Sequence, residues 1–201
     1  MALLILVLCT LINMTFATSW AQDCPQICKC YTNEELDMEP KILRNNSFMV
    51  DCVGRDVNDS MLALELDLLL SDVKLRENLI WVRINSTPLT HVPVSICQLS
   101  NLVWLHLDNN QLARLPDNCF TNMTRLNMLT AENNSINELQ NGLFDGLNSL
   151  KVLILSNNMI SSIGLDVFSN PNDLVSLSWI VLNRNRLHSL EPWPYIRGLH
   201  G

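Results

Sequence analysis

The sequence has few basic residues. Its 201 residues include 13 Lys and Arg against 20 Asp and Glu, which leaves a net charge of −7, and no basic block interrupts this balance. Surfaces that bind nucleic acids or anionic lipids need clustered positive charge, so the composition argues against both partners. Charged residues make up only 16% of the chain and hydrophobic residues 48%, which excludes a disordered chain and allows one folded domain.

Long apolar runs are missing after the N-terminus. Residues 1–16 carry no charge and are dominated by Leu, Ile, Met and Val. This stretch is shorter than the ~20 residues of a membrane span but is typical of a secretory signal peptide. Ser19 and Ala21 supply the small residues of a cleavage site, so residues 1–21 are predicted to be a signal peptide, with an uncleaved signal anchor as the alternative.

Catalytic motifs are also absent. The sequence contains no G-x-S-x-G, no P-loop and no His pair at metal-ligand spacing. His106 and Asp108 would share one face of a strand, but no nucleophile stands at a matching place. We therefore expect no enzymatic activity, no metal and no cofactor.

A sequence motif of leucine-like residues followed by an asparagine occurs four times. One copy reads Leu102, Leu105, Leu107, Asn110, Leu112 and Leu115, with apolar residues at positions 1, 4, 6, 11 and 14 and Asn at position 9. The closing residues are Asn110, Asn134, Asn158 and Asn185, and a weaker copy with Thr87 precedes them. Their spacing lies within the ~20–29 residues of a leucine-rich repeat.

The repeat predicts a solenoid of the α/β type. One coil cannot enclose its own apolar residues, so successive coils must stack and place short parallel strands on a concave face. The recurring asparagine is expected to bond backbone groups of its own and the adjacent coil, because its amide offers two donors and an acceptor. Residues 79–201 are thus predicted to form five repeats. Residues 57–78 are apolar but give no asparagine register, which leaves a degenerate first coil or a linker.

Six cysteines remain after the signal peptide. They are Cys24, Cys28, Cys30, Cys52, Cys97 and Cys119. An even number in a secreted chain favours disulfides, with a zinc site as the competing interpretation of the first four. Cys97 and Cys119 lie on the return segments of neighbouring coils, so stacking predicts a bridge between them, the alternative being two small buried hydrophobes.

The run CPQICKC together with Cys52 resembles the cysteine-rich N-terminal cap of extracellular leucine-rich repeat proteins. This group includes Slit-like proteins, the Nogo receptor, Toll-like receptors and small leucine-rich proteoglycans, and the resemblance covers residues 24–201. It implies a cap over residues 22–56 in which Cys24 pairs with Cys30 and Cys28 with Cys52, closing a β-hairpin over the first coil.

Position 3 of the repeats carries large apolar residues that would face the concave side. They are Trp81, Trp104, Met128, Val152 and Trp179. Arg83 and His106 at position 5 and Asp108 at position 7 add polar groups. Exposed apolar patches usually mark interaction sites, so these residues are predicted to bind a protein partner. Alternatively, the tryptophans cover neighbouring side chains or are shielded by glycans or by a second copy of the chain. The sequence does not distinguish a homodimer through this face from binding of another protein.

Five Asn-x-Ser/Thr sequons fit a secreted glycoprotein. They start at Asn45, Asn58, Asn85, Asn122 and Asn133. Asn85 and Asn133 would lie beside the concave strands, where glycans limit the approach of a partner.

These features predict an extracellular module for recognition, adhesion or co-receptor signalling. A structural matrix component or a soluble decoy isoform of a membrane receptor are the alternatives. The ending YIRGLHG matches the approach to a further coil whose first leucine would be residue 202, so the chain is expected to be part of a longer ectodomain without its C-terminal cap.

Overall fold

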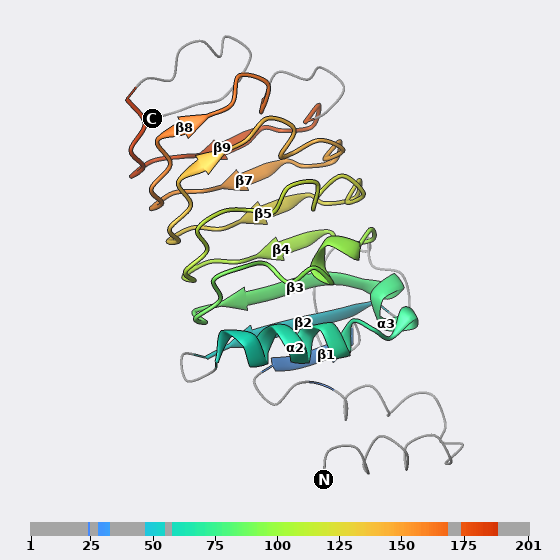
Figure 1. Cartoon of the computed structure of the whole chain (residues 1–201). Coiled ribbons are helices and arrows are strands. Elements are labelled where there is room, and N and C mark those ends of the chain that lie inside the picture. The colour runs from blue at the N-terminus through green and yellow to red at the C-terminus, as the bar shows by residue number, and fades with distance from the viewer. Residues whose placement is uncertain (1–23, 25–27, 33–46, 55–57, 169–173, 189–201) are drawn as a thin grey trace, which may run out of the picture.

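The computed structural model describes residues 24, 28–32, 47–54, 58–168 and 174–188. The predicted signal peptide, the Asn45 sequon and the chain end at 189–201 lie outside these described residues. Figure 1 shows the described coils stacked in one direction, with their strands side by side.

One seven-stranded sheet runs through the stack. Its spatial order is β1 (Cys28–Thr32), β2 (Phe48–Val53), β3 (Leu79–Asn85), β4 (Trp104–His106), β5 (Met128–Thr130), β7 (Val152–Ile154) and β9 (Trp179–Val181). Only β1 and β2 pair antiparallel; every later pair in this sheet is parallel. A second parallel pair joins β6 (Glu138–Leu139) and β8 (Ser162–Ile163) on the return segments. This is the predicted solenoid of parallel strands that begins with an antiparallel hairpin.

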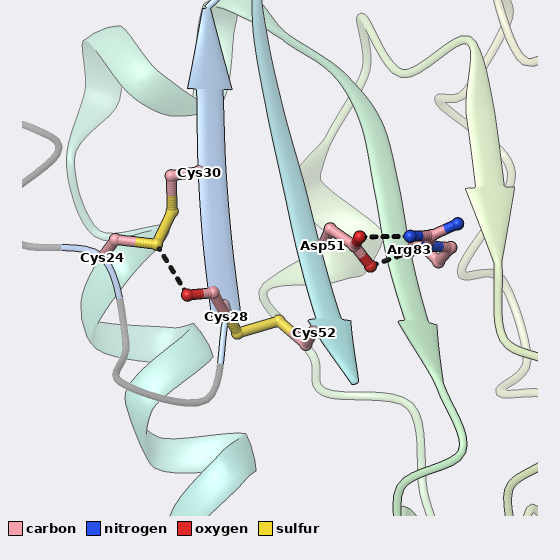
Figure 2. The surroundings of a disulfide bond; sticks show 6 residues. All are labelled: Cys24, Cys28, Cys30, Asp51, Cys52 and Arg83. Atoms are coloured by element: carbon pink, nitrogen blue, oxygen red, sulfur yellow. Dashed lines mark hydrogen bonds and ion pairs between the residues drawn. A yellow bond between two sulfur atoms is a disulfide. The ribbon is translucent and has the colours of Figure 1, made fainter. Parts of the chain in front are cut away.

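Two disulfides hold the N-terminal hairpin (Figure 2). Cys24 is bonded to Cys30, and Cys28 is bonded to Cys52 across β1 and β2, as the resemblance implied. Because β2 also pairs in parallel with β3, the hairpin continues the sheet of the repeats rather than forming a separate body.

Residues 57–78, whose structure the sequence left undefined, contain two helices. They are α2 (Asp59–Leu69) and α3 (Val73–Asn78), which return the chain from β2 to β3. Asn58 and Asp72 cap the two helices, since each side chain accepts hydrogen bonds from backbone N–H groups of the first turn. Helix α2 buries Leu62, Leu66 and Leu69, which share one face of the helix. These leucines take the place of the core leucines of a regular coil.

The leucines of successive coils form a continuous core. Leu105, Leu129 and Leu153 occupy the centres of β4, β5 and β7 and are fully buried. On the return segments Phe120, Phe144 and Phe168 stack on one another, with ring centroids 6.2 and 5.9 Å apart. A short 3-10 helix, η2 (Ile96–Gln98), places Cys97 against Cys119, and these two residues form the third disulfide.

The repeated asparagines form a hydrogen-bonded ladder between coils. Asn158 illustrates it: its Nδ2 donates to the carbonyls of Ala131 and Leu155, and its Oδ1 accepts from the N–H of Ile136. Asn134 and Asn185 repeat the same pattern. The ladder therefore satisfies backbone groups that the turn after each strand leaves without a partner in the sheet.

The coil that carries threonine uses the ladder differently. The backbone N–H and the hydroxyl of Thr87 both donate to Oδ1 of Asn110, at 3.0 and 2.6 Å. Asn110 in turn donates to the carbonyls of Ile84 and Leu107. Oδ1 of Asn110 thus accepts from the residue at position 9 of the preceding coil, whereas Oδ1 of Asn134 accepts from the N–H of Leu112 at position 11.

Candidate functional site

Position 3 forms one apolar column across the concave sheet. Trp81, Trp104, Met128, Val152 and Trp179 are direct register partners on neighbouring strands. The column continues onto the disulfide-bonded hairpin, where Met49 pairs with Trp81 and Tyr31 pairs with Met49. Sequence reasoning missed Met49 and Tyr31. Side chains alternate between the two faces of a strand, so core-facing cysteines at 30 and 52 place Tyr31 and Met49 on the concave face, and this was the signal that could have found them.

Exposure differs sharply along this column. Trp179 is 61% exposed, whereas Trp81 and Trp104 are half-buried. These two rings pack with Tyr31 around the buried side chains of Met49, Ile80 and Val103. The tryptophans near the hairpin thus cover their neighbours, because the hairpin adds side chains beside them, while Trp179 has no comparable cover among the described residues.

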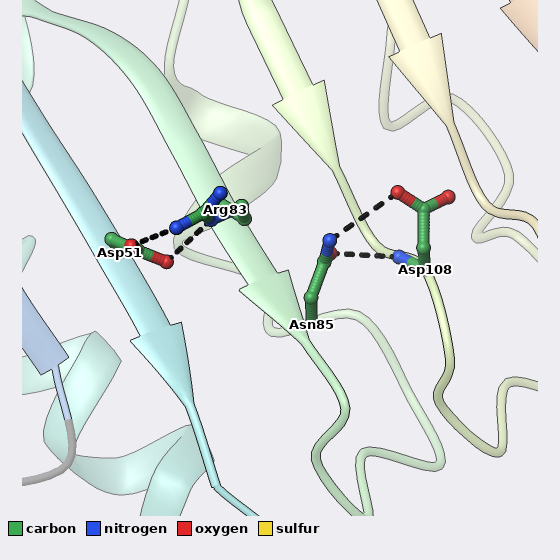
Figure 3. A network of polar contacts seen from close by, with 4 residues as sticks. All are labelled: Asp51, Arg83, Asn85 and Asp108. Atoms are coloured by element: carbon green, nitrogen blue, oxygen red, sulfur yellow. Dashed lines mark hydrogen bonds and ion pairs between the residues drawn. The ribbon is translucent and has the colours of Figure 1, made fainter.

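An ion pair lies beside the apolar column near the hairpin. Arg83 donates two hydrogen bonds to the carboxylate of Asp51 on the neighbouring strand, as Figures 2 and 3 show. These bonds raise the pKa of Arg83. The guanidinium also lies 5.4 Å from the ring centre of Trp81, within the range of a cation–π contact. Asp51 therefore holds Arg83 against Trp81, and neither charge is free.

Asp108 is the centre of a second polar network (Figure 3). Asn85 accepts from the backbone N–H of Asp108 at 2.9 Å and donates to its carboxylate at 3.4 Å. The same carboxylate accepts from the hydroxyl of Thr130 at 2.7 Å and from the N–H of Glu132 at 2.8 Å. Three neighbouring coils are thereby joined through one carboxylate.

His106 connects to this network through Thr130. Its Nδ1 lies 3.0 Å from Oγ1 of Thr130. Since the hydroxyl has one hydrogen and donates it to Asp108, we assign the Nδ1 proton to His106 as the donor to Thr130. Burial lowers the pKa of His106, Asp108 opposes that shift and Arg83 adds to it. The imidazole ring therefore favours its neutral form. It lies in a T-shaped arrangement with Trp81, with the two ring centroids 6.2 Å apart.

The sheet becomes apolar away from the hairpin. Position 5 is occupied by Ile154 on β7 and Val181 on β9, next to Val152 and Trp179. Glu132 borders this area, but its Oε1 accepts from Ser156 and Asn157 of the next coil. Among the described residues, the concave sheet thus has a polar part near the hairpin and an apolar part that includes Val152, Ile154 and Trp179.

The described sequons differ in their surroundings. Asn58 caps α2 and Asn122 lies exposed on a return segment, away from the concave strands. Asn85 is half-buried in the network around Asp108. Asn133 is exposed just beyond β5, and its Nδ2 donates to Oδ1 of Asn109 at 2.7 Å. Their glycosylation stays a prediction.

The described part of the chain offers no group of three or more His, Cys, Asp or Glu side chains that could hold a metal ion. Within those same residues, no helix is long and apolar enough to cross a membrane.

Comparison with known proteins identifies the repeats. The family model described as leucine rich repeat matches residues 77–136 and 131–187. No curated protein matches the chain. Among solved structures, TLR13 in complex with ssRNA13 is similar at 26% identity and a TM-score of 0.52, covering 57% of this chain. A leucine-rich repeat protein of Leptospira interrogans is similar at 26% identity and a TM-score of 0.51, covering 58% of this chain. The matches span only 16% and 28% of those two proteins.

Proposed function

Since the chain belongs to the leucine-rich repeat family, whose members are generally non-catalytic binding modules, we propose that it is an extracellular module that binds a protein partner across its concave sheet. In this proposal the partner supplies an apolar segment that packs against Trp179, Val152, Ile154 and Val181. Recognition, adhesion or co-receptor signalling are the roles that such a module serves.

The apolar column ending at Trp179 is the observation that carries this proposal. An indole that is 61% exposed loses much apolar surface to a partner, and tryptophan is enriched among the residues that dominate interface energies. The strands hold the column in register, so little side-chain or backbone ordering is needed on binding. Trp81 and Trp104 contribute mainly by supporting the sheet, because their rings are already half-buried.

A nucleic-acid partner is not part of the proposal, although the similar TLR13 structure contains an RNA. The chain has a net charge of −7, and Arg83 on the concave sheet is already paired with Asp51. Asp108 and Glu132 add negative charge near the strand ends. Phosphate groups would meet repulsion here rather than the free positive charge that they require.

The extracellular assignment is supported by the disulfides and the sequons. Three disulfides among the described residues are typical of an oxidising compartment. Within the Asn85 sequon, the hydroxyl of Thr87 is buried and donates to Asn110, so a glycan at Asn85 would have to be added before this coil folds. We therefore expect Asn58, Asn122 and Asn133 to be the better-used sites.

The test is a binding measurement on the secreted, full-length chain. A collection of extracellular protein domains is screened, and each binder is measured against Trp179→Ala and Val175→Ala. Val175 is the matched control, since it is 66% exposed but outside the column. We expect Trp179→Ala to weaken binding ~tenfold or more and the control to leave it unchanged.

Two results would count against the proposal. Binders that tolerate both Trp179→Ala and Val152→Asp would show that the apolar part of the sheet is not the docking surface. A loss of binding with Val175→Ala alone would place that surface on the return segments. Sedimentation of the same variants separates a second copy of the chain from other partners, because only self-association depends on the protein concentration alone.

A further inference from the structure

A polar hollow of about 430 Å³ opens where the chain leaves β3, β4 and β5. It is lined by Ser86, Thr87, Pro88, Asn109, Asn110, Gln111, Asn133, Asn134 and Ser135. None of these residues is charged or aromatic, and all except Pro88 carry a hydroxyl or amide side chain. Small-ligand sites commonly occupy ~300–1,000 Å³, so the hollow is large enough for a small molecule but lacks the apolar lining of a typical ligand pocket.

Some polar side chains on the walls of the hollow are buried and hydrogen-bonded to backbone, and others are exposed to solvent. The side chains of Asn110 and Asn134 are buried and bond the backbone of their own and neighbouring coils. In contrast, Asn109, Gln111 and Asn133 are exposed. An uncharged surface of accessible amides and hydroxyls suits a ligand that both donates and accepts hydrogen bonds and carries no charge, which is the chemistry of a sugar.

Asn133 stands on the wall of this hollow and begins the sequon completed by Ser135. We propose that an N-linked glycan on Asn133 turns into the hollow, so that its inner sugars lie along Asn109 and Gln111 towards Ser86. In the attachment step, Nδ2 of Asn133 loses one proton and bonds to C1 of the first sugar, and the polyprenyl diphosphate that carried the oligosaccharide leaves. The second Nδ2 hydrogen remains available for the bond to Asn109.

None of the other described sequons has its asparagine on the wall of the hollow. Asn58 and Asn122 line no part of the hollow. Asn85 directs its amide to Asp108, on the concave side of the strand ends. A glycan seated beside Asn133 therefore flanks the edge formed by Asp108 and Glu132 and leaves the column ending at Trp179 uncovered. The inference rests on the proposed extracellular function, because only the secretory pathway supplies the oligosaccharide donor.

The experiment compares two glycans on the same folded protein. The full-length chain is secreted from cultured eukaryotic cells, and the rate at which a glycan-removing amidase releases each sugar chain is followed by mass spectrometry of the glycopeptides. We expect release from Asn133 to be at least ~tenfold slower than release from Asn122 in the folded protein, with the difference lost after denaturation.

Two variants test the role of the hollow directly. Asn109→Gly removes a wall side chain while tolerating the left-handed backbone there, where φ is 57°, and should speed release at Asn133 without changing Asn122. Ser135→Ala removes the sequon but keeps Asn133, and should lower the melting temperature by about 2–4 °C. Thr124→Ala, which removes the Asn122 sequon, is the matched control and should leave the melting temperature unchanged.

The outcomes separate this inference from the proposed function. An occupied Asn122 with a bare Asn133, or equal release rates from both sites in the folded protein, overturns the inference alone. A chain that is not secreted makes the extracellular assignment fail together with the inference, whereas a secreted chain without a glycan at Asn133 overturns the inference alone. Slow release that Asn109→Gly does not accelerate shows that the glycan does not use the hollow.

Discussion

The asparagine ladder predicts a pH-dependent defect when one amide becomes a carboxylate. Asn158→Asp keeps the number of heavy atoms in the side chain but replaces the Nδ2 donor with an oxygen. In the structure, that nitrogen lies 2.8 Å from the carbonyl oxygen of Ala131 and 3.1 Å from that of Leu155. The acceptor bond to the N–H of Ile136 is preserved. At neutral pH the substitution therefore places a carboxylate oxygen against the carbonyl oxygens of Ala131, Leu155 and Ser156 at a buried position.

The size of the effect follows from the lost donor and from the new charge. Both carbonyls keep a second donor, since Asn134 also donates to Ala131 and Asn185 to Leu155. Each lost hydrogen bond costs ~0.5–1.5 kcal/mol, and burial of an unpaired carboxylate beside carbonyl oxygens adds to this, so we expect a loss of about 4 kcal/mol at pH 7. A typical domain has a free energy of unfolding of only ~5–15 kcal/mol. The variant should therefore be close to unfolding, although its shape and volume are unchanged.

The pH dependence has a definite sign. Burial and the adjacent carbonyl oxygens favour the protonated acid, so the pKa of the introduced carboxyl is raised in the folded state above its unfolded value of ~3.9. A raised folded pKa means that stability relative to wild type is lost as pH rises and regained as pH falls, because the protonated acid can again donate to Ala131. The difference between variant and wild type should accordingly shrink between pH 7 and pH 5.

Denaturant unfolding of both proteins at pH 7 and pH 5 measures this difference. The control is Asn137→Asp, which makes the same chemical change on an exposed side chain and should cost less than about 0.5 kcal/mol. A defect that is the same at both pH values would refute the idea that the amide donor sustains the ladder. So would a defect no larger than that of Asn137→Asp.

Two further predictions concern the third disulfide and His106. The double substitution of Cys97 and Cys119 by alanine should reduce the free energy of unfolding by about 3 kcal/mol, since the bridge closes a loop across a sequence separation of 22; unchanged unfolding in denaturant would contradict this. Because burial lowers the pKa of His106 in the folded state, its contribution to stability is complete above the unfolded value of ~6.5 and is lost as pH falls below it. His106→Gln should therefore flatten the stability profile between pH 7 and pH 5, and an equally steep profile in the variant would show that other groups cause the acid loss.

The proportion of the fold that the sequence predicts is high where the repeat is regular. The spacing of Asn110, Asn134 and Asn158 located the coils, and the alternation around Leu105 indicated which side chains are buried. Both follow from local periodicity, because each coil contacts mainly its neighbours and the same residue pattern recurs at each contact. Stacking of adjacent coils also sufficed to place Cys97 beside Cys119.

Residues 57–78 were the part of the fold that periodicity did not resolve. Leu62, Leu66 and Leu69 have helical spacing, but the surrounding run is apolar on every side, with Met61, Leu64 and Leu68 exposed. An apolar run of this kind suits a coil, a helix or a buried strand equally well. The choice depends on the hairpin strand β2, which must be connected to β3 in parallel and so needs a crossover.

For the candidate site, the sequence alone determined which side chains share the concave column, since alternation along each strand assigns Trp81, Trp104 and Trp179 to one face. Only the tertiary structure decided which of them is accessible. Met49 and Tyr31 come from the disulfide-bonded hairpin, and Asp51 reaches Arg83 across 32 residues of sequence. Exposure and charge pairing depend on such distant neighbours, which a local repeat cannot specify. The physical reason is that facing direction is a property of one strand, whereas burial is a property of everything packed around it.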